Sequence, residues 1–161
     1  MYVIEGISQM NQVQLCLADE TIEPRVDRQV SLGRRLIQSG DISPWQLFFA
    51  LERQSRWDAT LGEIFLAKGW IDEEKLLAAY ATHYSAQHAD LNRIPPSQSL
   101  TGLLEPNFCL KHSIVPWMRH GASVILATSR PDRIEALRAD LPVELREAPI
   151  AIAPQEQIRM F

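Results

Sequence analysis

Two stretches of this chain decide how it folds: residues 31–54, SLGRRLIQSGDISPWQLFFALERQ, and residues 60–83, TLGEIFLAKGWIDEEKLLAAYATH. A shift of 29 residues superimposes the first stretch on the second. The identical pairs are Leu32 with Leu61, Gly33 with Gly62, Gly40 with Gly69, Ile42 with Ile71, Leu47 with Leu76 and Ala50 with Ala79. Self-similarity at a fixed spacing indicates a supersecondary unit that the chain uses twice.

Each repeat predicts two helices joined by a tight turn, because its apolar residues recur at helical spacing on both sides of a glycine. Gly40 and Gly69 stand where a helix needs a left-handed residue just past its end. Ser43 and Asp72 follow three residues later and are good N-caps. Pro44 then takes the first helical position, where proline is favoured. The unit is therefore a helical hairpin.

Gly33 and Gly62 need a different explanation, since both are expected near the start of a helix. Glycine costs about 1 kcal/mol there relative to alanine. The absence of a side chain lets another helix or a flat ligand approach the backbone, and helix N-terminal N–H groups favour an anion such as phosphate. Either close packing of two hairpins or a ligand site accounts for these glycines.

The second half of the chain has a different pattern. Residues 88–99 are polar and contain Pro95 and Pro96, which predicts a linker or an ordered crossover and a boundary near residue 95. A helix is then expected over 103–111, strands over 113–119 and 122–128, a helix over 132–141, a strand over 143–153 and a helical turn from Pro154. The fold class is α+β, with 1–30 as an N-terminal extension or linker, 31–94 as a repeated helical module and 95–161 as a small α/β module.

Composition excludes several classes of function. The net charge is −4 and no basic stripe recurs along a predicted helix, so we expect no DNA or RNA partner. Cys16 and Cys109 have no disulfide or zinc spacing, and no metal site is expected. The apolar runs are too short to cross a membrane and no secretory signal opens the chain, which favours a cytoplasmic protein or a fragment of a longer one.

No catalytic motif is present in the sequence. It lacks a phosphate-binding loop with its Gly-Lys-Ser/Thr end, a Gly-x-Ser-x-Gly elbow and a His-Glu-x-x-His helix. The four histidines, His83, His88, His112 and His120, have no ligand-like spacing. We therefore expect a protein that is not an enzyme and that carries no prosthetic group.

The doubled motif resembles the MshEN family, the N-terminal domains of type II secretion and type IV pilus ATPases, which are related to the N-terminal domain of GspE. Each repeat has Leu-Gly, an apolar pair, a glycine and leucine-like positions in the family's order. His-Ser-Ile-Val-Pro at 112–116, Ser-Val-Ile-Leu-Ala-Thr at 123–128 and Pro131-Asp132 resemble the family's second module. The resemblance covers nearly the whole chain and implies a regulatory domain at the inner face of the bacterial inner membrane.

The resemblance also implies a ligand, bis-(3′-5′)-cyclic dimeric GMP (cyclic di-GMP), held over apolar residues with polar groups that read guanine. The first half-site would be formed by Ser31, Leu32, Gly33, Leu36, Ile37, Gly40, Leu47, Leu51 and Gln54. The second would be formed by Thr60, Leu61, Gly62, Phe65, Leu66, Gly69, Leu76, Tyr80 and His83. Binding across both half-sites would fix the two hairpins relative to each other and regulate an attached enzyme.

Three positions depart from the family pattern, since Ser31 and Thr60 replace its leading arginines and His83 replaces its final glutamine. Loss of a bidentate Arg–guanine contact costs roughly 1 to 3 kcal/mol. The alternative is a protein–protein docking domain with a degenerate nucleotide site, which binds the cytoplasmic part of a membrane protein and uses tryptophans as anchors. Similar domains are attached to ATPases and to NfrB-like membrane glycosyltransferases, and the unmatched residues 1–24 favour the second type of parent.

Overall fold

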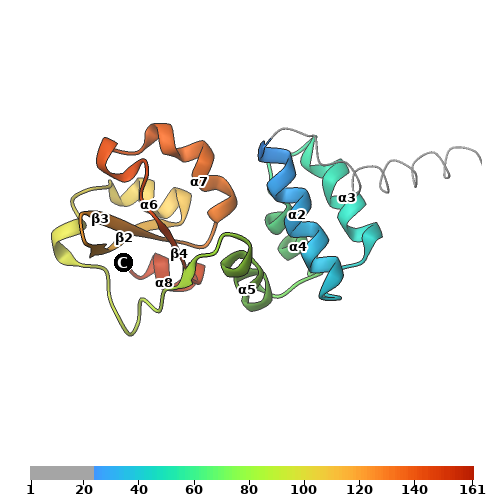
Figure 1. Ribbon diagram of the computed structural model, residues 1–161, viewed down its shortest axis with the longest axis horizontal. Coiled ribbons are helices and arrows are strands. Elements are labelled where there is room, and N and C mark those ends of the chain that lie inside the picture. Colours follow the sequence, from blue (N-terminus) through green and yellow to red (C-terminus); the bar gives the residue numbers. More distant parts are fainter. Residues whose placement is uncertain (1–23) are drawn as a thin grey trace, which may run out of the picture. The chain divides into compact units, whose positions relative to one another are not determined.

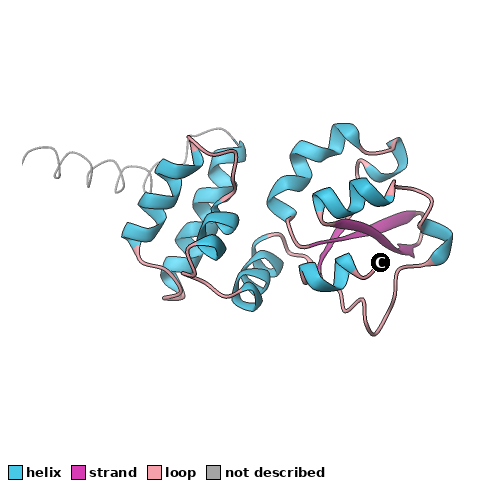
Figure 2. Cartoon of the chain, turned by 180° about the vertical axis from the view of Figure 1, so that it is seen from behind, coloured by secondary structure: helices cyan, strands magenta, loops and turns pink. Residues whose placement is uncertain are grey.

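The computed structural model describes the backbone of residues 24–161 and the side chains of residues 31–161. The chain divides into two units, one ending at Asp72 and the other running from Glu73 to Phe161. The first contains only helices, and the second combines helices with a sheet, as Figures 1 and 2 show. The predicted α+β fold class is confirmed.

The first unit contains α2 (Pro24–Gln38), α3 (Pro44–Gln54) and α4 (Leu61–Ala67). We expected residues 1–30 to be an extension or linker, and this is wrong for 24–30, which are the first two turns of α2. Pro24 is tolerated in the first turn of a helix, and in the sequence Val26 and Val30 continue the helical spacing toward Gly33 and Ile37. The earlier part of the expected extension, residues 1–23, lies outside the described residues.

The core of the first unit is built from the repeated apolar positions. Leu32, Leu36, Leu47, Leu61 and Phe65 are each at most 2% exposed. The remaining buried apolar residues are Ile42, Ala50, Ile64 and Ile71. Leu32 and Leu61, Leu36 and Phe65, and Ile42 and Ile71 occupy the same positions of the two repeats, so this part of the repeat is explained by packing within the first unit.

The second unit begins with α5 (Glu73–His83) and contains a four-stranded sheet in the order β1-β4-β3-β2. The strands are β1 (Gln87–His88), β2 (Ile114–His120), β3 (Ser123–Thr128) and β4 (Ile150–Ile152). β4 is parallel to both β1 and β3, whereas β2 and β3 are antiparallel. Gly121, at φ +60, provides the turn between β2 and β3.

Both faces of this sheet are covered, because side chains of a strand alternate between its faces. Val124 and Leu126 of β3 pack with Ile134 of α7 (Pro131–Leu137). Ile125 and Ala127 pack with Ile158 of α8 (Gln155–Arg159). α6 (Pro106–His112) lies on the same side as α7, and α8 lies on the other side (Figure 1).

One prediction in this half needs correction, and one strand was not predicted. Only Ile150–Ile152 of the strand expected over 143–153 is extended, because residues 143–145 form a 3₁₀ turn closed by the Leu145 N–H on the Pro142 carbonyl, 2.8 Å. The stretch 88–99, expected as a linker or an ordered crossover, begins within β1, which pairs with β4, and Ala89 N–H adds a bond of 2.8 Å to the Ile152 carbonyl. A two-residue strand is too short to show a period of two in the sequence.

The remaining elements follow the expected pattern with shifted ends. α6 begins at Pro106 rather than at residue 103, because proline is favoured in the first helical turn. α7 ends at Leu137 and continues as a 3₁₀ turn to Asp140. α5 and β1 are grouped with the sheet, whereas we expected both to precede a boundary at residue 95. Among residues 24–161, no helix has the length and apolar character that crossing a bilayer requires.

Candidate functional site

The end of α2 is shaped by Gly40, which has φ +79. Gly40 N–H bonds to the Ile37 carbonyl at 3.0 Å, and Asp41 N–H bonds to the Leu36 carbonyl at 2.9 Å. This pair of bonds is a Schellman motif, in which the two residues after the helix satisfy its last carbonyls. The predicted left-handed glycine at this helix end is therefore confirmed.

The end of α4 repeats the same geometry 29 residues later. Gly69, at φ +63, bonds through its N–H to the Leu66 carbonyl at 2.9 Å, and Trp70 N–H bonds to the Phe65 carbonyl at 3.0 Å. The rings of Trp70 and Phe65 lie 6.3 Å apart, which is the apolar contact that accompanies such a helix end. The sequence repeat is thus a repeat of backbone geometry.

The beginnings of α3 and α4 also match. Ser43 and Thr60 are N-caps, and each accepts a hydrogen bond from the residue three positions later, Gln46 N at 3.2 Å and Glu63 N at 3.3 Å. The side chains of Gln46 and Glu63 bond back to the cap residues, which completes two capping boxes. The predicted N-cap at Ser43 and the predicted proline at the first helical position, Pro44, are confirmed. Asp72, the other predicted cap, directly precedes α5.

Gly33 marks a close approach between α2 and α3. A Cβ atom at this position would lie 2.4 Å from Leu47 Cδ1 and 2.9 Å from its Cδ2. Packing is therefore sufficient to explain this glycine. It does not lie near a helix start, as we expected, because α2 already begins at Pro24, so no free N–H groups surround it. Gly62 is the second residue of α4, as predicted.

The candidate ligand residues of the first unit differ in their access to solvent. The buried ones are Leu32, Gly33, Leu36, Leu47, Thr60, Leu61, Gly62 and Phe65. The accessible ones comprise the half-buried Ser31, Ile37, Leu51 and Gln54 and the exposed Gly40, Leu66 and Gly69. Only the accessible group could contact a ligand directly in this conformation.

Three candidate residues, Leu76, Tyr80 and His83, belong to α5 and hence to the second unit. Leu76 and Tyr80 are each 2% exposed. The Tyr80 hydroxyl donates to Asp132 Oδ2 at 2.7 Å, and this buried bond joins α5 to α7. His83 is half-buried, with its ring 4.8 Å from that of Tyr84. These three residues are therefore described with the second unit, and their part in a nucleotide site stays a prediction.

Sequence reasoning missed a cluster of rings and cations on α3 and after α4. The Arg53 guanidinium lies 4.8 Å from the ring centroids of both Phe49 and Trp57, and Lys68 Nζ lies 5.4 Å from that of Phe49. The edge of Trp70 meets Phe49 with centroids 5.6 Å apart. The spacing of Phe49, Arg53 and Trp57, four residues each, was visible in the sequence.

Burial shifts the pKa of two side chains of the second unit, Cys109 and His112. Burial raises the pKa of the Cys109 thiol, so the thiol stays protonated at neutral pH. Burial lowers the pKa of His112, and the positive charge of Lys111 lowers it further. Residues 24–161 contain no cluster of three His, Cys, Asp or Glu side chains able to hold a metal ion.

Comparisons with known proteins find one matching family and several similar proteins. The family described as MshEN domain matches residues 84–161. The type IV pilus assembly ATPase PilB of Myxococcus xanthus (strain DK1622) is 29% identical over 106 residues, which make up 66% of this chain and 19% of PilB. The chain thus corresponds to about a fifth of that relative.

Two solved structures are similar in fold. The structure of MshE with cdg has a TM-score of 0.63 and 28% identity, over 79% of this chain and 92% of that chain. The N-terminal domain of XpsE has a TM-score of 0.51 and 14% identity, over 88% and 96%, and shares the fold alone. Because residues 84–161 are less than half of the chain, the 79% coverage extends the likeness to MshE into the repeated helices.

Proposed function

We propose that this chain, which resembles the MshEN domain over residues 84–161, binds cyclic di-GMP and regulates a pilus or secretion ATPase. The observation that supports the ligand is the likeness to MshE, whose structure was solved with cdg, which we take to be this nucleotide. The XpsE structure is that of an N-terminal domain, and the match to PilB covers 19% of that ATPase. In this proposal the chain therefore corresponds to a non-catalytic part of such proteins.

An ATPase is our proposal for the attached or partner enzyme because PilB is one. We expected a membrane glycosyltransferase from the residues before the repeat, and no relative described above supports that parent. The last of those residues, Pro24, begins α2 and so belongs to the helical unit itself. The proposed setting is the cytoplasmic face of the inner membrane, where pilus and secretion ATPases would use a soluble second messenger.

The proposed nucleotide contacts follow the accessible residues of the repeat. Ile37, Leu51 and Leu66 would provide apolar contact for purine rings, and Ser31 and Gln54 would provide polar groups. Thr60 is 6% exposed and already occupied in its capping box, so it is a poor substitute for the family's arginine. We therefore propose weaker binding than a doubly arginine-bearing motif would give.

The test is calorimetric titration of the chain with cyclic di-GMP, with GTP and cyclic di-AMP as controls. Saturable binding that is specific for the cyclic guanine dinucleotide is expected. Leu66→Glu should abolish this binding, because it puts a charge where an apolar contact to a purine ring is proposed. Leu66 is 39% exposed, so the charge is tolerated without unfolding. Val143→Glu, at a 79% exposed position of the second unit, is the matched control. No heat at high micromolar cyclic di-GMP would contradict the proposal.

A gain-of-binding variant tests the motif independently. Ser31→Arg restores the family's leading residue at a half-buried position of α2 and should tighten binding about tenfold. Gln38→Arg, which adds the same cation at an exposed position of the same helix, is the control. Unchanged affinity in Ser31→Arg would show that the first repeat does not read guanine.

The second candidate function is that of a protein–protein docking domain. It is favoured by the exposure of two tryptophans, Trp45 at 67% and Trp57 at 46%, both in the first unit. Tryptophan is normally buried, and it is enriched at interface hot spots. The other two tryptophans are less exposed. Trp117 is 4% exposed, and its Nε1–H donates to the Ile94 carbonyl. Trp70 is half-buried against Phe49 and Phe65.

A further inference from the structure

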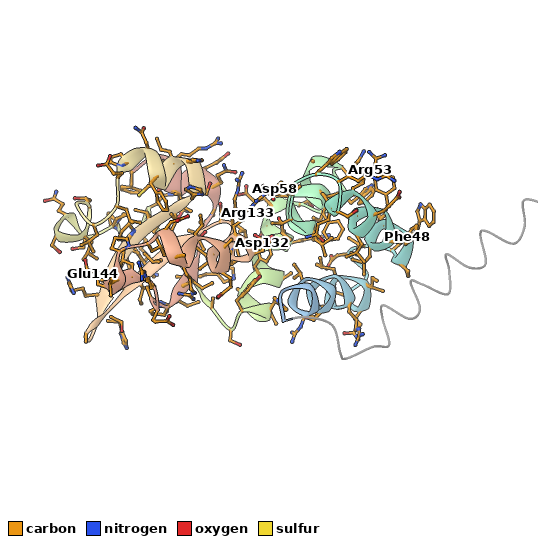
Figure 3. All side chains as sticks on the ribbon, turned by 90° about the horizontal axis from the view of Figure 1, so that it is seen from above. Phe48, Arg53, Asp58, Asp132, Arg133 and Glu144 are labelled. Atoms are coloured by element: carbon orange, nitrogen blue, oxygen red, sulfur yellow. The ribbon has the colours of Figure 1, made fainter. Side chains whose placement is uncertain are left out.

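The first unit carries a surface that the cyclic di-GMP proposal does not use. We define it as the Arg53 surface, made of Phe49, Arg53 and Trp57 from α3 and the turn after it, with Lys68 and Trp70 from the end of α4. None of these residues is among those assigned to the nucleotide. Figure 3 labels Arg53 on α3.

The rings hold the Arg53 side chain in a defined orientation. Its guanidinium carbon is 4.8 Å from the centroid of Phe49 and 4.8 Å from that of Trp57. Contacts between a cation and ring faces leave the N–H groups at the edge of the guanidinium plane available. A guanidinium whose plane is fixed in this way is preorganised for bidentate recognition of a carboxylate.

Both cations of the surface lack a carboxylate partner. Among the residues that the structure describes, Arg53 and Lys68 form no ion pair, and Lys68 Nζ instead lies 5.4 Å from the Phe49 centroid. The neighbouring Arg56 differs, since it pairs with Glu52 at 3.2 Å. The Arg53 surface thus presents two positive charges around one aromatic centre.

The surface is also apolar enough to contribute binding energy. Trp57 is 46% exposed, and Trp70 and Phe49 are half-buried beside it. Tryptophan and arginine are the residue types most enriched among interface hot spots, and aromatic rings keep their affinity because they lose little side-chain entropy on binding. Rings and cations together suit a ligand that offers apolar and acidic groups side by side.

We propose that the Arg53 surface docks an acidic segment of a partner protein, in which a carboxylate pairs with Arg53 and an adjacent apolar or aromatic side chain packs on Trp57. This proposal rests on the second candidate function, that of a protein–protein docking domain. It adds which surface docks and which chemistry the partner presents. A polyanionic partner such as nucleic acid is disfavoured because the whole chain has a net charge of −4.

A peptide selection tests the chemistry of the partner without knowing its identity. A random 12-residue phage library is selected on the immobilised chain and counter-selected on an Arg53→Glu, Lys68→Glu variant. The expected result is a consensus that contains Asp or Glu beside Trp, Phe or Leu. No enrichment, or a consensus without acidic residues, would overturn the proposal.

Variants then place the selected peptide on the surface. Calorimetry of the best peptide should show at least about tenfold weaker binding to Arg53→Gln and to Trp57→Ala. Arg56→Gln, which removes a nearby exposed arginine outside the surface, should bind as the parent does. Equal loss in all three variants would show that general charge, not the Arg53 surface, carries the binding. Circular dichroism of each variant excludes unfolding as the cause.

The two proposals can fail separately. Peptide binding is repeated with saturating cyclic di-GMP present, and we expect peptide still to bind at the Arg53 surface. Competition between nucleotide and peptide would overturn the docking proposal and reassign the cations to the nucleotide. Peptide binding without any nucleotide binding would instead leave the docking function as the only one supported.

Discussion

Replacement of Gly33 by alanine is the most direct test of how the first repeat packs. The new Cβ would lie 2.4 Å from Leu47 Cδ1, 2.9 Å from Cδ2 and 3.2 Å from Cγ, and Leu47 is only 1% exposed. Overpacking a full core costs about 1 to 3 kcal/mol, whereas alanine gains about 1 kcal/mol over glycine inside a helix. The net expectation for Gly33→Ala is a loss of about 1 kcal/mol in the free energy of unfolding.

Urea unfolding followed by tryptophan fluorescence is a suitable assay, because Trp45, Trp57 and Trp70 all lie in the first unit. A double-mutant cycle with Leu47→Ala isolates the contact. Leu47→Ala alone should cost about 2 to 5 kcal/mol, but Gly33→Ala in that background should stabilise by about 1 kcal/mol, since the clash is gone. The coupling between the two sites would then be about 2 kcal/mol.

Two other glycines separate the clash from backbone strain. Gly102 has open space around its Cβ position and no left-handed φ, so Gly102→Ala should be neutral or slightly stabilising. Gly40 also has open space but adopts φ +79, so Gly40→Ala should cost about 1 kcal/mol through strain alone. If Gly33→Ala is as stable as the parent, the Leu47 side chain yields freely and the close approach does not constrain the fold.

Three further results are expected. Tyr80→Phe should lower the free energy of unfolding by about 2 kcal/mol, because Asp132 loses a buried hydroxyl donor at 2.7 Å; an unchanged urea midpoint would show that the bond contributes nothing. The free energy of unfolding should fall as the pH drops below 6.5, the ordinary pKa of histidine. The reason is that the lowered pKa of His112 makes the folded state bind a proton less readily than the unfolded state. In thermal melts from pH 7.5 to 5, His112→Gln should flatten this dependence. In a Cys16→Ser background, iodoacetamide at pH 7.5 should modify Cys109 slowly in the folded chain and quickly in the urea-unfolded chain. The reason is that the raised pKa of the folded thiol keeps it protonated. Equal rates would contradict the half-buried position of Cys109.

The repeat was predictable because its signals are local. A left-handed glycine after a helix and an N-cap three residues later depend on residues within one turn of each other, and Gly40 and Ser43 confirm both. The strands on either side of Gly121 were predictable for the same reason, since a turn glycine between two apolar runs indicates a hairpin. The family resemblance rested on these same positions.

The errors arose where the outcome depends on distant residues. β1 exists because Gln87 and His88 meet β4, more than sixty residues later, and nothing within a two-residue segment announces that pairing. α2 begins at Pro24, and its first two turns lie before the repeat that predicted the rest of the helix. α5 looks like the second helix of a hairpin in the sequence, yet its Glu73 and Tyr80 bond to Gln155 and Asp132 of the second unit.

The sequence by itself determined the two helical repeats, their glycine-ended helices and the acidic composition of the chain, because periodicity, capping and composition are properties of neighbouring residues. Only the tertiary structure decided that Gly33 meets Leu47, that α5 belongs with the sheet and that Arg53 lies between two rings. These outcomes follow from the packing of elements against each other, whose contacts depend on side-chain shape and chain topology that no local pattern encodes.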